Sequence, residues 1–344
     1  MRYKLLGKSG LRVSEVALGT MTFGEDWGWG ASKDESRKIF EAYVEAGGNF
    51  IDTACNYTNG TSEKFVGEFI AAEREQLVVA TKYTLSTRPK DPNGGGNSRK
   101  NMVQSLETSL KRLGTDYIDL FWLHMWDYTT PLEEVMRGLD DLVRAGKVLY
   151  IGISDTPAWV VAEANTLADL RGWSRFVALQ LPYNLDGRTV EAELLPMARH
   201  FDMAVTAWGT LASGLLTGKY SEGNSTEPKR QGEAKLTERQ AVIVEELGRI
   251  AQELGRPRTQ VAINWVRQQQ QRALTIPILG ARKVEQLKDN LACLEFELSQ
   301  EQLNRLDEVS KLELGFPHNF WGEAYVKQLI FGETFSQIDN HRNS

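Results

Sequence analysis

Apolar residues recur along the chain with two periods, one typical of buried strands and one typical of helices. In the helical segments they return every three or four positions, as at Met102, Leu106, Leu110 and Leu113. This spacing places them on one face of an amphipathic helix. Short apolar runs predict strands over 16–20, 49–52, 77–83, 117–123, 148–153, 176–181, 203–207 and 273–276. Strands that alternate with helices predict a parallel sheet, and eight such units predict an α/β protein with a (β/α)8 TIM barrel.

Segments at both ends of the chain add to this barrel. Residues 3–6 and 12–16 flank a Gly-Lys-Ser-Gly turn and predict an N-terminal β-hairpin. Helices predicted over 283–292 and 299–309 are extra helices near the C-terminus. Barrels of this kind span about 200 to more than 400 residues, so a single domain over 1–344 is expected.

Local signals predict where several helices begin and where the chain is irregular. Ser32 and Glu35 have the spacing of a capping box. Thr130 followed by Pro131 is typical of an N-cap and a first helical residue. A helix is predicted over 189–199, and the polar segment Ser221–Ala234 is predicted to be a mobile loop.

Composition and charge exclude several classes of function. The net charge of −6 and the lack of a basic stretch argue against a nucleic-acid partner. Cys55 and Cys293 are the only cysteines, which favours a reducing compartment and gives no zinc site or other metal site. No apolar run at the start indicates a signal peptide, and none approaches the ~20 residues of a membrane span. A cytoplasmic protein without a membrane partner is therefore expected.

Two glycine-containing segments lack the spacing of nucleotide-binding motifs. Gly28-x-Gly30-x-x-Lys33 has no third glycine, so it does not fit a dinucleotide fingerprint. Gly214-x-x-x-Gly218-Lys219 has the wrong spacing for a P-loop, and Tyr220 stands where Ser or Thr is needed. Rossmann and kinase folds are therefore disfavoured.

Polar residues end three successive strand-like runs. Asp52, Lys82 and His124 stand at these ends, and Tyr57 follows the first run by five residues. Alone, each could be a surface residue or a satisfied core residue. In a parallel barrel, however, catalytic groups gather at the carboxyl ends of the strands.

The four residues together suit the reduction of a carbonyl group. A free phenol titrates near ~10 and is a weak acid at neutral pH. We expect the Lys82 ammonium to lower the pKa of Tyr57 and Asp52 to keep Lys82 charged. His124 can donate a hydrogen bond to the carbonyl oxygen. Cys55 lies between Asp52 and Tyr57 but has no evident base, so it is not expected to act as a nucleophile.

These residues fall in a series of motifs that resembles the aldo-keto reductase family over nearly the whole chain. The motifs are Gly19-Thr20-Met21, Asp52-Thr-Ala-x-x-Tyr57, Lys82, Leu123-His124, Gly152-Ile-Ser-Asp155, Gln180-x-x-Tyr183-Asn184 and Ile276-Pro-x-x-Gly280-x-Arg282. Residues 152–159 and Phe316-Pro317-His318 further resemble the aryl-alcohol dehydrogenase-like branch of that family.

The resemblance implies that NADP(H) binds extended across the carboxyl face of the barrel. Ser154, Asp155 and Gln180 would bind the nicotinamide carboxamide, and Trp208 would stack on the nicotinamide. The pyrophosphate would be held by Gly209 to Ser213, Gly214 and Lys219. The adenosine end would be held by Gly280, Arg282, Gln286 and Asn290, with Arg282 on the 2′-phosphate. Asp155 and Thr210 stand where many relatives have Asn and Pro. The full set implied for the cofactor is Gly19, Thr20, Met21, Asp52, Ser154, Asp155, Gln180, Trp208, Gly209, Thr210, Leu211, Ser213, Gly214, Lys219, Gly280, Arg282, Gln286 and Asn290.

Aromatic residues in predicted loops are candidates for a substrate pocket, which would favour aryl or other apolar carbonyl compounds. They are Phe23, Trp27, Trp29, Trp126, Tyr128, Phe320 and Trp321. The expected function is NADP-dependent reduction of aldehydes or ketones to alcohols, with Tyr57 as the general acid. Two alternatives remain open: a cofactor-binding regulatory subunit that resembles potassium-channel β subunits, and a Schiff-base lyase with Lys82 as its nucleophile.

Overall fold

A computed structural model describes residues 1–218 and 236–339 of the protein. The chain divides into two compact units, Met1–Ser310 and Lys311–Ser344. The barrel lies wholly within the first unit, and the expectation of one domain over the full length stays a prediction. Lys219 and the loop predicted over 221–234 lie outside the described residues.

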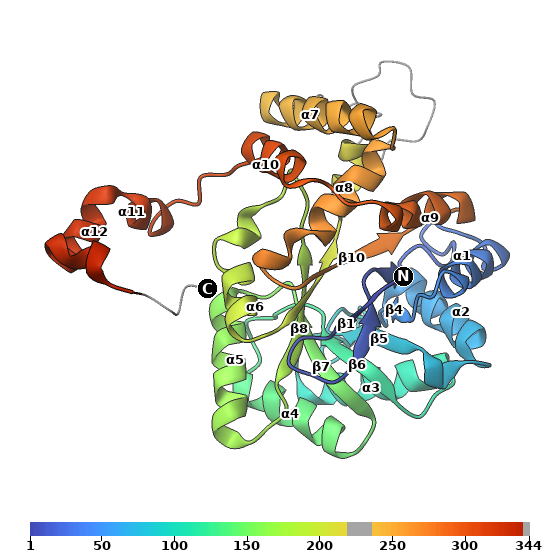
Figure 1. The fold of residues 1–344 in the computed structure, drawn as a ribbon. Helices are drawn as coiled ribbons and strands as arrows, with labels where there is room; N and C mark the ends of the chain where they lie inside the picture. The colour runs from blue at the N-terminus through green and yellow to red at the C-terminus, as the bar shows by residue number, and fades with distance from the viewer. Residues whose placement is uncertain (219–235, 340–344) are drawn as a thin grey trace. The chain divides into compact units, whose positions relative to one another are not determined.

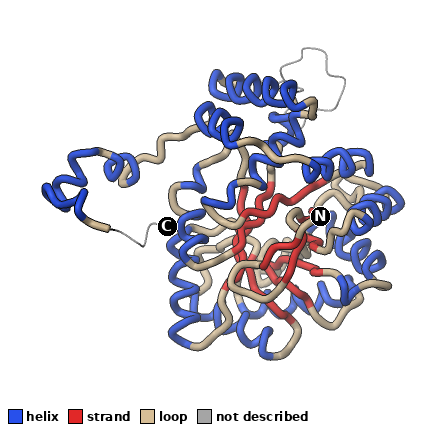
Figure 2. Tube along the Cα trace, in the orientation of Figure 1, coloured by secondary structure: helices blue, strands red, loops and turns tan. Residues whose placement is uncertain are grey.

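The first unit is a closed barrel of eight parallel strands surrounded by helices, which confirms the predicted fold (Figures 1 and 2). Neighbouring strands follow the chain order around the barrel, and the last strand closes on the first. The strands are β3 (Ala17–Gly19), β4 (Phe50–Asp52), β5 (Val78–Tyr83), β6 (Ile118–Leu123), β7 (Val148–Ser154), β8 (Phe176–Pro182), β9 (Ala204–Trp208) and β10 (Thr275–Gly280). The predicted antiparallel hairpin is also present, as β1 (Tyr3–Leu5) and β2 (Arg12–Ser14).

Strand β10 differs most from its predicted range. The sequence indicated an end at Ile276, because proline at 277 cannot donate a hydrogen bond to a neighbouring strand. In the structure the strand continues past Pro277 and changes partner there. Thr275–Pro277 pair with β9, and Ile278–Gly280 pair with β3. Gly280 therefore ends beside Gly19, at the carboxyl edge of the barrel.

The helices of the first unit follow the strands as predicted. They are α1 (Lys33–Glu45), α2 (Thr61–Ile70), α3 (Arg99–Leu113), α4 (Leu132–Arg144), α5 (Ala158–Arg171), α6 (Leu194–His200), α7 (Glu238–Leu254), α8 (Arg258–Arg267), α9 (Val284–Leu291) and α10 (Gln300–Val309). The helix predicted over 189–199 is shorter, with a separate 3-10 turn at Thr189–Glu191. Pro196 explains this difference, because proline is tolerated in the first turn of a helix but breaks the interior.

Two predicted helix starts are only partly as expected. Ser32 does cap α1, since its hydroxyl accepts a hydrogen bond from the Glu35 amide at 3.3 Å. The Glu35 carboxylate does not return the bond and instead accepts from the Val284 amide at 2.8 Å, at the start of α9. At α4 the capping position is Pro131, and the Thr130 hydroxyl donates to Asp127 at 2.8 Å.

The core has two layers. One fills the barrel and consists of inward strand residues such as Phe50 and Trp122, closed at one end by Leu6 and Val13 of the hairpin segment. The other lies between the strands and the surrounding helices and includes Ile51 and Phe121. Successive residues of a strand therefore belong to alternate layers, as the pleat of a strand requires. Among the described residues, no helix is long and apolar enough to cross a membrane.

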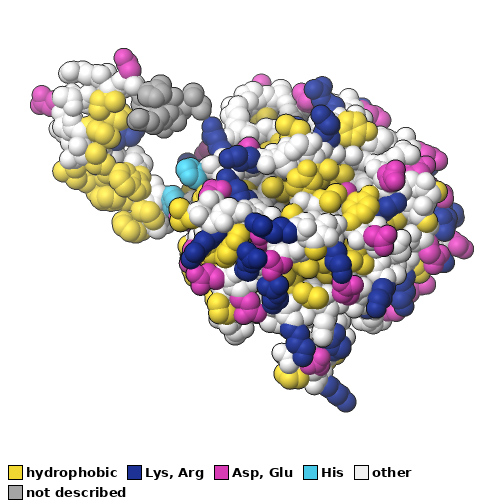
Figure 3. Space-filling model, turned by 90° about the horizontal axis from the view of Figure 1, so that it is seen from below, with side chains coloured by type: hydrophobic (Ala, Val, Ile, Leu, Met, Phe, Trp, Pro, Cys, Tyr) yellow, Lys and Arg dark blue, Asp and Glu magenta, His cyan; other side chains and the backbone are white. Residues whose placement is uncertain are grey.

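The second unit contains α11 (His318–Gly322), α12 (Ala324–Phe331) and a 3-10 segment, Gly332–Gln337. Of its described hydrophobic side chains, only Val326 is buried. Apolar side chains gather on the face that this unit turns to the viewer in Figure 3. Large exposed apolar residues of the unit are Leu314, Phe316, Phe320, Trp321, Tyr325, Leu329, Ile330, Phe331, Phe335 and Ile338.

Candidate active site

Strand alternation turns the predicted catalytic side chains toward the inside of the barrel. Phe50 faces inward, so Asp52 two positions later does too. Ala80 and Trp122 also face inward. Lys82 and His124, each two positions later, therefore face inward as well. All three lie at the carboxyl ends of neighbouring strands and are almost fully buried.

Lys82 is the centre of the hydrogen bonds at this end of the barrel. Its Nζ donates to Asp52 Oδ2 at 2.5 Å, to the Thr53 carbonyl oxygen at 2.9 Å and to the Tyr57 hydroxyl at 3.2 Å. The second Asp52 oxygen accepts from Gln180 Nε2 at 3.1 Å. The structure therefore joins the predicted carboxylate, ammonium and phenol directly.

Burial and charge act in opposite directions on Lys82 and Tyr57. Burial lowers the pKa of Lys82, but the charge of Asp52 and the hydrogen bonds to Asp52 and Tyr57 outweigh this effect, so the net pKa is raised. Burial raises the pKa of Tyr57, and the nearby Lys82 ammonium lowers it by less, so the net pKa is also raised. The expectation of a lowered pKa for Tyr57 is therefore wrong. The loss of hydration of the buried phenolate outweighs the effect of the Lys82 ammonium on this pKa. Both groups hold their protons at neutral pH.

His124 is a neutral neighbour of Tyr57. Burial, together with the Lys82 charge, holds the pKa of His124 well below its usual value. The two aromatic rings meet edge to face, with centroids 5.9 Å apart. Among the described residues, His124 Nδ1 has no hydrogen-bond partner although it is buried. A neutral imidazole here can donate one hydrogen bond to a carbonyl oxygen beside Tyr57.

A turn of unusual backbone geometry carries Tyr57. Thr58, Asn59 and Gly60 follow it with left-handed φ values of 44°, 56° and 91°. This conformation is rare for a β-branched residue such as Thr58. The Thr58 hydroxyl is held on both sides, donating to the Phe23 carbonyl oxygen at 2.6 Å and accepting from the Ser62 amide at 3.0 Å.

Next to this turn lies an ion pair that was not predicted from the sequence. Arg112 Nη1 lies 3.0 Å from Glu63 Oε2 and 2.7 Å from the Cys55 carbonyl oxygen. Glu63 is fully buried and also accepts from the Thr81 hydroxyl at 2.7 Å. One signal was available: Glu63 lies on the same helical stripe as Val66 and other buried residues, where a carboxylate needs a partner. Cys55 itself is buried, which raises its pKa to about 12 and agrees with its exclusion as a nucleophile.

The residues implied for the nicotinamide end lie at the carboxyl ends of the strands, near Asp52. Ser154 and Gln180 are buried, and Gln180 contacts Asp52 directly. Asp155 has a left-handed φ of 41°, and its carboxylate accepts from Trp208 Nε1 at 3.3 Å. Burial raises the pKa of Asp155. The Trp208 side chain is 41% exposed, so its ring is accessible to a bound molecule.

The segment after β9 supplies the loop implied for the pyrophosphate. Thr210 is buried, whereas Gly209 and Ser213 are exposed, and Leu211 and Gly214 are intermediate. Gly209 has a φ of +67°, and a Cβ built there would meet nothing within 4 Å, so open space lies over the backbone. The Gly209 backbone is therefore accessible to a bound molecule.

Asn184 holds this loop against the preceding strand. Its Nδ2 donates to the Gly209 carbonyl oxygen at 2.9 Å, while its Oδ1 accepts from the amides of Asp186 and Gly187. The Tyr183 amide also donates to the Trp208 carbonyl oxygen at 3.2 Å. The loop is therefore anchored although Thr210 replaces the proline common in the family.

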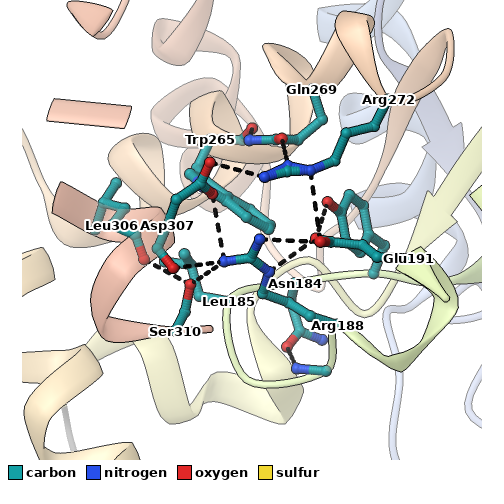
Figure 4. A network of polar contacts seen from close by, with 12 residues as sticks. Asn184, Leu185, Arg188, Glu191, Trp265, Gln269, Arg272, Leu306, Asp307 and Ser310 are labelled. Atoms are coloured by element: carbon teal, nitrogen blue, oxygen red, sulfur yellow. Dashed lines mark hydrogen bonds and ion pairs between the residues drawn. The ribbon is translucent and has the colours of Figure 1, made fainter. Parts of the chain in front are cut away.

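The Asn184 segment is in turn fixed by a buried network, shown in Figure 4. Arg188 binds both Glu191 oxygens, at 2.8 and 3.0 Å, and donates to Ser310 Oγ at 2.7 Å. Its guanidinium lies over the ring of Trp265, at 5.2 Å from the centroid. The Tyr183 hydroxyl donates to the same Glu191 carboxylate at 2.6 Å. The network ties the loop after β8 to α8 and to the end of α10.

The residues implied for the adenosine end cluster at the end of β10 and on α9. Gly280 is exposed, and a Cβ there would also meet nothing within 4 Å. The Arg282 amide donates to Gln286 Oε1 at 3.0 Å, and the Arg282 side chain is partly exposed. Asn290 is buried on α9. On the adjacent β3, Gly19 pairs with Gly280, Thr20 is buried and donates to the Asp52 carbonyl oxygen, and Met21 is exposed.

The aromatic residues predicted for the substrate pocket do not form one group. Trp27 lies closest to the site, with its ring centroid 6.5 Å from that of Tyr57, and packs on Trp29 at 5.7 Å. Tyr128 is 71% exposed. Phe23 and Trp126 are buried in the hydrophobic cluster, where Phe23 packs on Phe69, and their place in the substrate pocket stays a prediction. Phe320 and Trp321 belong to the second unit, and their role stays a prediction.

The carboxyl end of this (β/α)8 barrel brings the buried Asp52, Lys82 and His124 together with the half-buried Tyr57, an arrangement that suits an oxidoreductase. Residues 15–311 match the model of the Aldo/keto reductase family, and the chain belongs to that family. It is 40% identical to an aryl-alcohol dehydrogenase [NADP(+)] of Phanerodontia chrysosporium, over 92% of this chain and 87% of the relative.

Two other relatives cover similar lengths. A putative aryl-alcohol dehydrogenase of Saccharomyces cerevisiae is 37% identical over 95% of this chain and 92% of its own. A norsolorinic acid reductase of Aspergillus flavus is 38% identical over 93% of this chain and 84% of its own. The resemblance to the aryl-alcohol dehydrogenase-like branch is thereby confirmed.

Proposed function

We propose that the protein reduces aldehydes or ketones to alcohols with NADPH, and that Tyr57 is the general acid. The observation that carries this proposal is the contact of the Tyr57 hydroxyl with Lys82 Nζ at 3.2 Å, beside the Asp52 carboxylate. A protonated phenol beside a fixed ammonium can donate its proton and is stabilised as the phenolate that results.

The described residues fit a bound NADP(H) molecule, which would supply the hydride. Open space over Gly209 and Gly280 leaves room for the phosphates and the adenosine end. Arg282 suits the 2′-phosphate, since a guanidinium binds phosphate through two parallel hydrogen bonds. The carboxamide would meet Gln180 and Asp155, and Trp208 would cover the nicotinamide ring.

The other residues of the site prepare the carbonyl group for reaction. His124 is neutral, so it can donate a hydrogen bond to the carbonyl oxygen and leave Tyr57 as the proton donor. Asp52 keeps Lys82 charged and in place through the 2.5 Å contact. Because the pKa of Lys82 is raised, its amine is protonated and cannot attack a carbonyl carbon, which argues against the Schiff-base lyase.

The substrates proposed are aryl or other apolar carbonyl compounds. The packed pair of Trp27 and Trp29 places aromatic surface next to Tyr57. The names of the relatives, aryl-alcohol dehydrogenases and norsolorinic acid reductases, also refer to aromatic compounds.

The decisive variant is Tyr57→Phe, which keeps the ring and removes only the acidic hydroxyl. We expect loss of carbonyl reduction with nearly normal NADPH binding, measured by quenching of tryptophan fluorescence. Reduction of a panel of aldehydes and ketones by the wild type, followed by NADPH absorbance, is the reference. Near-normal turnover in the variant would exclude Tyr57 as the acid, and no turnover by the wild type would favour the regulatory-subunit alternative.

A further inference from the structure

The turn that carries Tyr57 needs support from its surroundings. Three consecutive residues with left-handed φ values, 58 to 60, are unfavourable for the chain on its own. Such a conformation persists only where the surrounding structure fixes it, and it is often found at active sites. The position of the Tyr57 hydroxyl therefore depends on whatever holds the two ends of this turn.

Arg112, from the last turn of α3, contacts both ends. Its Nη1 donates to the carbonyl oxygen of Cys55 at 2.7 Å, where the turn begins. At the other end, a Cβ built on Gly60 would lie 2.4 Å from Arg112 Cζ, so the guanidinium lies directly against the Gly60 backbone. A planar guanidinium can fill this narrow space while it donates, and an ammonium cannot do both.

Glu63 connects this arginine to the strand of Lys82. Its carboxylate binds Arg112 through one oxygen, at 3.0 Å, and accepts from the Thr81 hydroxyl through the other, at 2.7 Å. Thr81 is the residue before Lys82 on β5 and points outward, as Lys82 points inward. One chain of contacts thus joins the turn of Tyr57 to the strand that places its lysine partner.

We propose that Arg112 is a positioning residue for carbonyl reduction: through the Cys55 carbonyl and Glu63 it holds the Tyr57 hydroxyl at hydrogen-bonding distance from Lys82. This inference rests on the proposed role of Tyr57 as the acid. Arg112 does not touch the reacting atoms, so its effect is on the geometry of the acid and not on the binding of the cofactor.

The test compares Arg112→Lys with Arg74→Lys. Arg74 forms the same kind of buried pair, 2.7 Å from Asp119, with both side chains nearly buried. That pair lies at the amino ends of β5 and β6, since Asp119 also accepts from the Val79 amide. Both variants keep the positive charge and lose the planar guanidinium. They differ only in which end of the barrel the substitution disturbs.

We expect Arg112→Lys to lower kcat on the order of 10- to 100-fold, as a small misplacement of a catalytic group does. The KM for NADPH should stay unchanged, and the upper limit of the pH–rate profile should move to higher pH because Tyr57 is less close to the Lys82 ammonium. Arg74→Lys should lower the melting temperature and leave kcat and the pH profile unchanged.

Thr81→Val provides a second route if Arg112→Lys does not fold, because it keeps the side-chain shape and removes the donor to Glu63. We expect a smaller loss of kcat with the same shift of the upper pH limit. A folded Arg112→Lys enzyme with wild-type kcat and pH profile would overturn the inference, and so would an unshifted Thr81→Val enzyme. Turnover retained by Tyr57→Phe would instead overturn the proposed function, so the two failures are distinguishable.

Discussion

Lys82 is the residue on which the charge of the site depends. It is completely buried, and its ammonium is balanced by one carboxylate, that of Asp52. Removing one partner of a buried ion pair leaves an uncompensated charge and costs about 3–5 kcal/mol. A packed apolar pair in the same place is often as stable as a buried ion pair or more stable, so stability alone does not explain the pair of Lys82 and Asp52, and a role of its charge in the reaction would.

The pH dependence of Lys82→Met tests this role. Methionine removes the charge that lowers the pKa of Tyr57, while burial, which raises it, remains. The pKa of the phenol should therefore rise further, so the residual activity should persist to higher pH than in the wild type. We expect most activity to be lost, and a pH series of kcat/KM with one good aldehyde measures both effects.

His124→Gln is the companion variant in that series. Glutamine can still donate to a carbonyl oxygen, so it should retain more activity than His124→Ala and leave the upper pH limit near that of the wild type. If Lys82→Met changed neither the rate nor the upper pH limit, Lys82 would be only a structural partner of Asp52.

Arg282 gives a prediction about the choice of cofactor. Its partly exposed guanidinium lies at the carboxyl end of β10, where the resemblance implies the 2′-phosphate. Arg282→Ala should weaken the binding of NADPH by roughly 1.5–3 kcal/mol, the free energy of a hydrogen bond to a charged group. NADH lacks the phosphate and should lose little. Fluorescence titrations with both cofactors compare the two losses, and equal losses would show that Arg282 does not contact the phosphate.

At the scale of elements, the loop after β8 determines the shape of the loop after β9. Asn184 provides the link, since one side-chain atom donates to Gly209 and the other accepts from two amides of its own loop. The Arg188 network in Figure 4 fixes the loop after β8, because Arg188 binds both Glu191 and Ser310 at the end of α10. A substitution that removes only the hydrogen bond from Asn184 to Gly209 should therefore weaken cofactor binding.

Asn184→Asp is such a change, because the carboxylate keeps both acceptor contacts and loses the donor to Gly209. We expect NADPH affinity to fall by about 1 kcal/mol, roughly fivefold. The kcat at saturating NADPH should stay near the wild-type value, since no atom of the Tyr57–Lys82 pair moves. Titration and saturation kinetics separate the two quantities. A normal dissociation constant would contradict the anchoring role.

The sequence predicted the strands and their catalytic ends because a strand has a simple period. Once Phe50 and Ala80 are assigned to the interior, Asp52 and Lys82 follow by alternation. The turn of Tyr57 could not be predicted in this way, because Thr58 adopts a conformation that its residue type disfavours. Only tertiary contacts stabilise that conformation.

Long-range contacts explain the remaining differences. Arg112 and Glu63 meet only because α2 and α3 are neighbours, and nothing in their own segments specifies the pairing. Phe23 follows a strand in a loop, so the sequence made it a candidate for the substrate pocket. Its packing on Phe69 in the hydrophobic core could not be read from its own segment. The net pKa of Tyr57 likewise depends on burial, which residue spacing does not report.

At the scale of the whole molecule, the chain divides into the barrel unit and the C-terminal unit. Among the described residues, the apolar clusters of the barrel end at Val309. The second unit buries one described hydrophobic side chain, Val326, and exposes many large ones. The free energy of unfolding of the barrel therefore should not depend on residues 311–344.

A chain that ends at Ser310 tests this separation and the predicted role of Phe320 and Trp321 together. Because the barrel cores are unchanged, we expect its melting temperature to stay within about 2 °C of the full-length value, the shift given by ~1 kcal/mol in a domain of this size. NADPH affinity should also be unchanged, since every described residue implied for the cofactor precedes 311. If the two aromatic residues contact the substrate, KM should rise for an aryl aldehyde and stay constant for a small aliphatic one, which has too little surface to reach them. A large fall in melting temperature would show that the second unit stabilises the barrel. An unchanged KM for both aldehydes in a stable truncated enzyme would remove Phe320 and Trp321 from the substrate pocket.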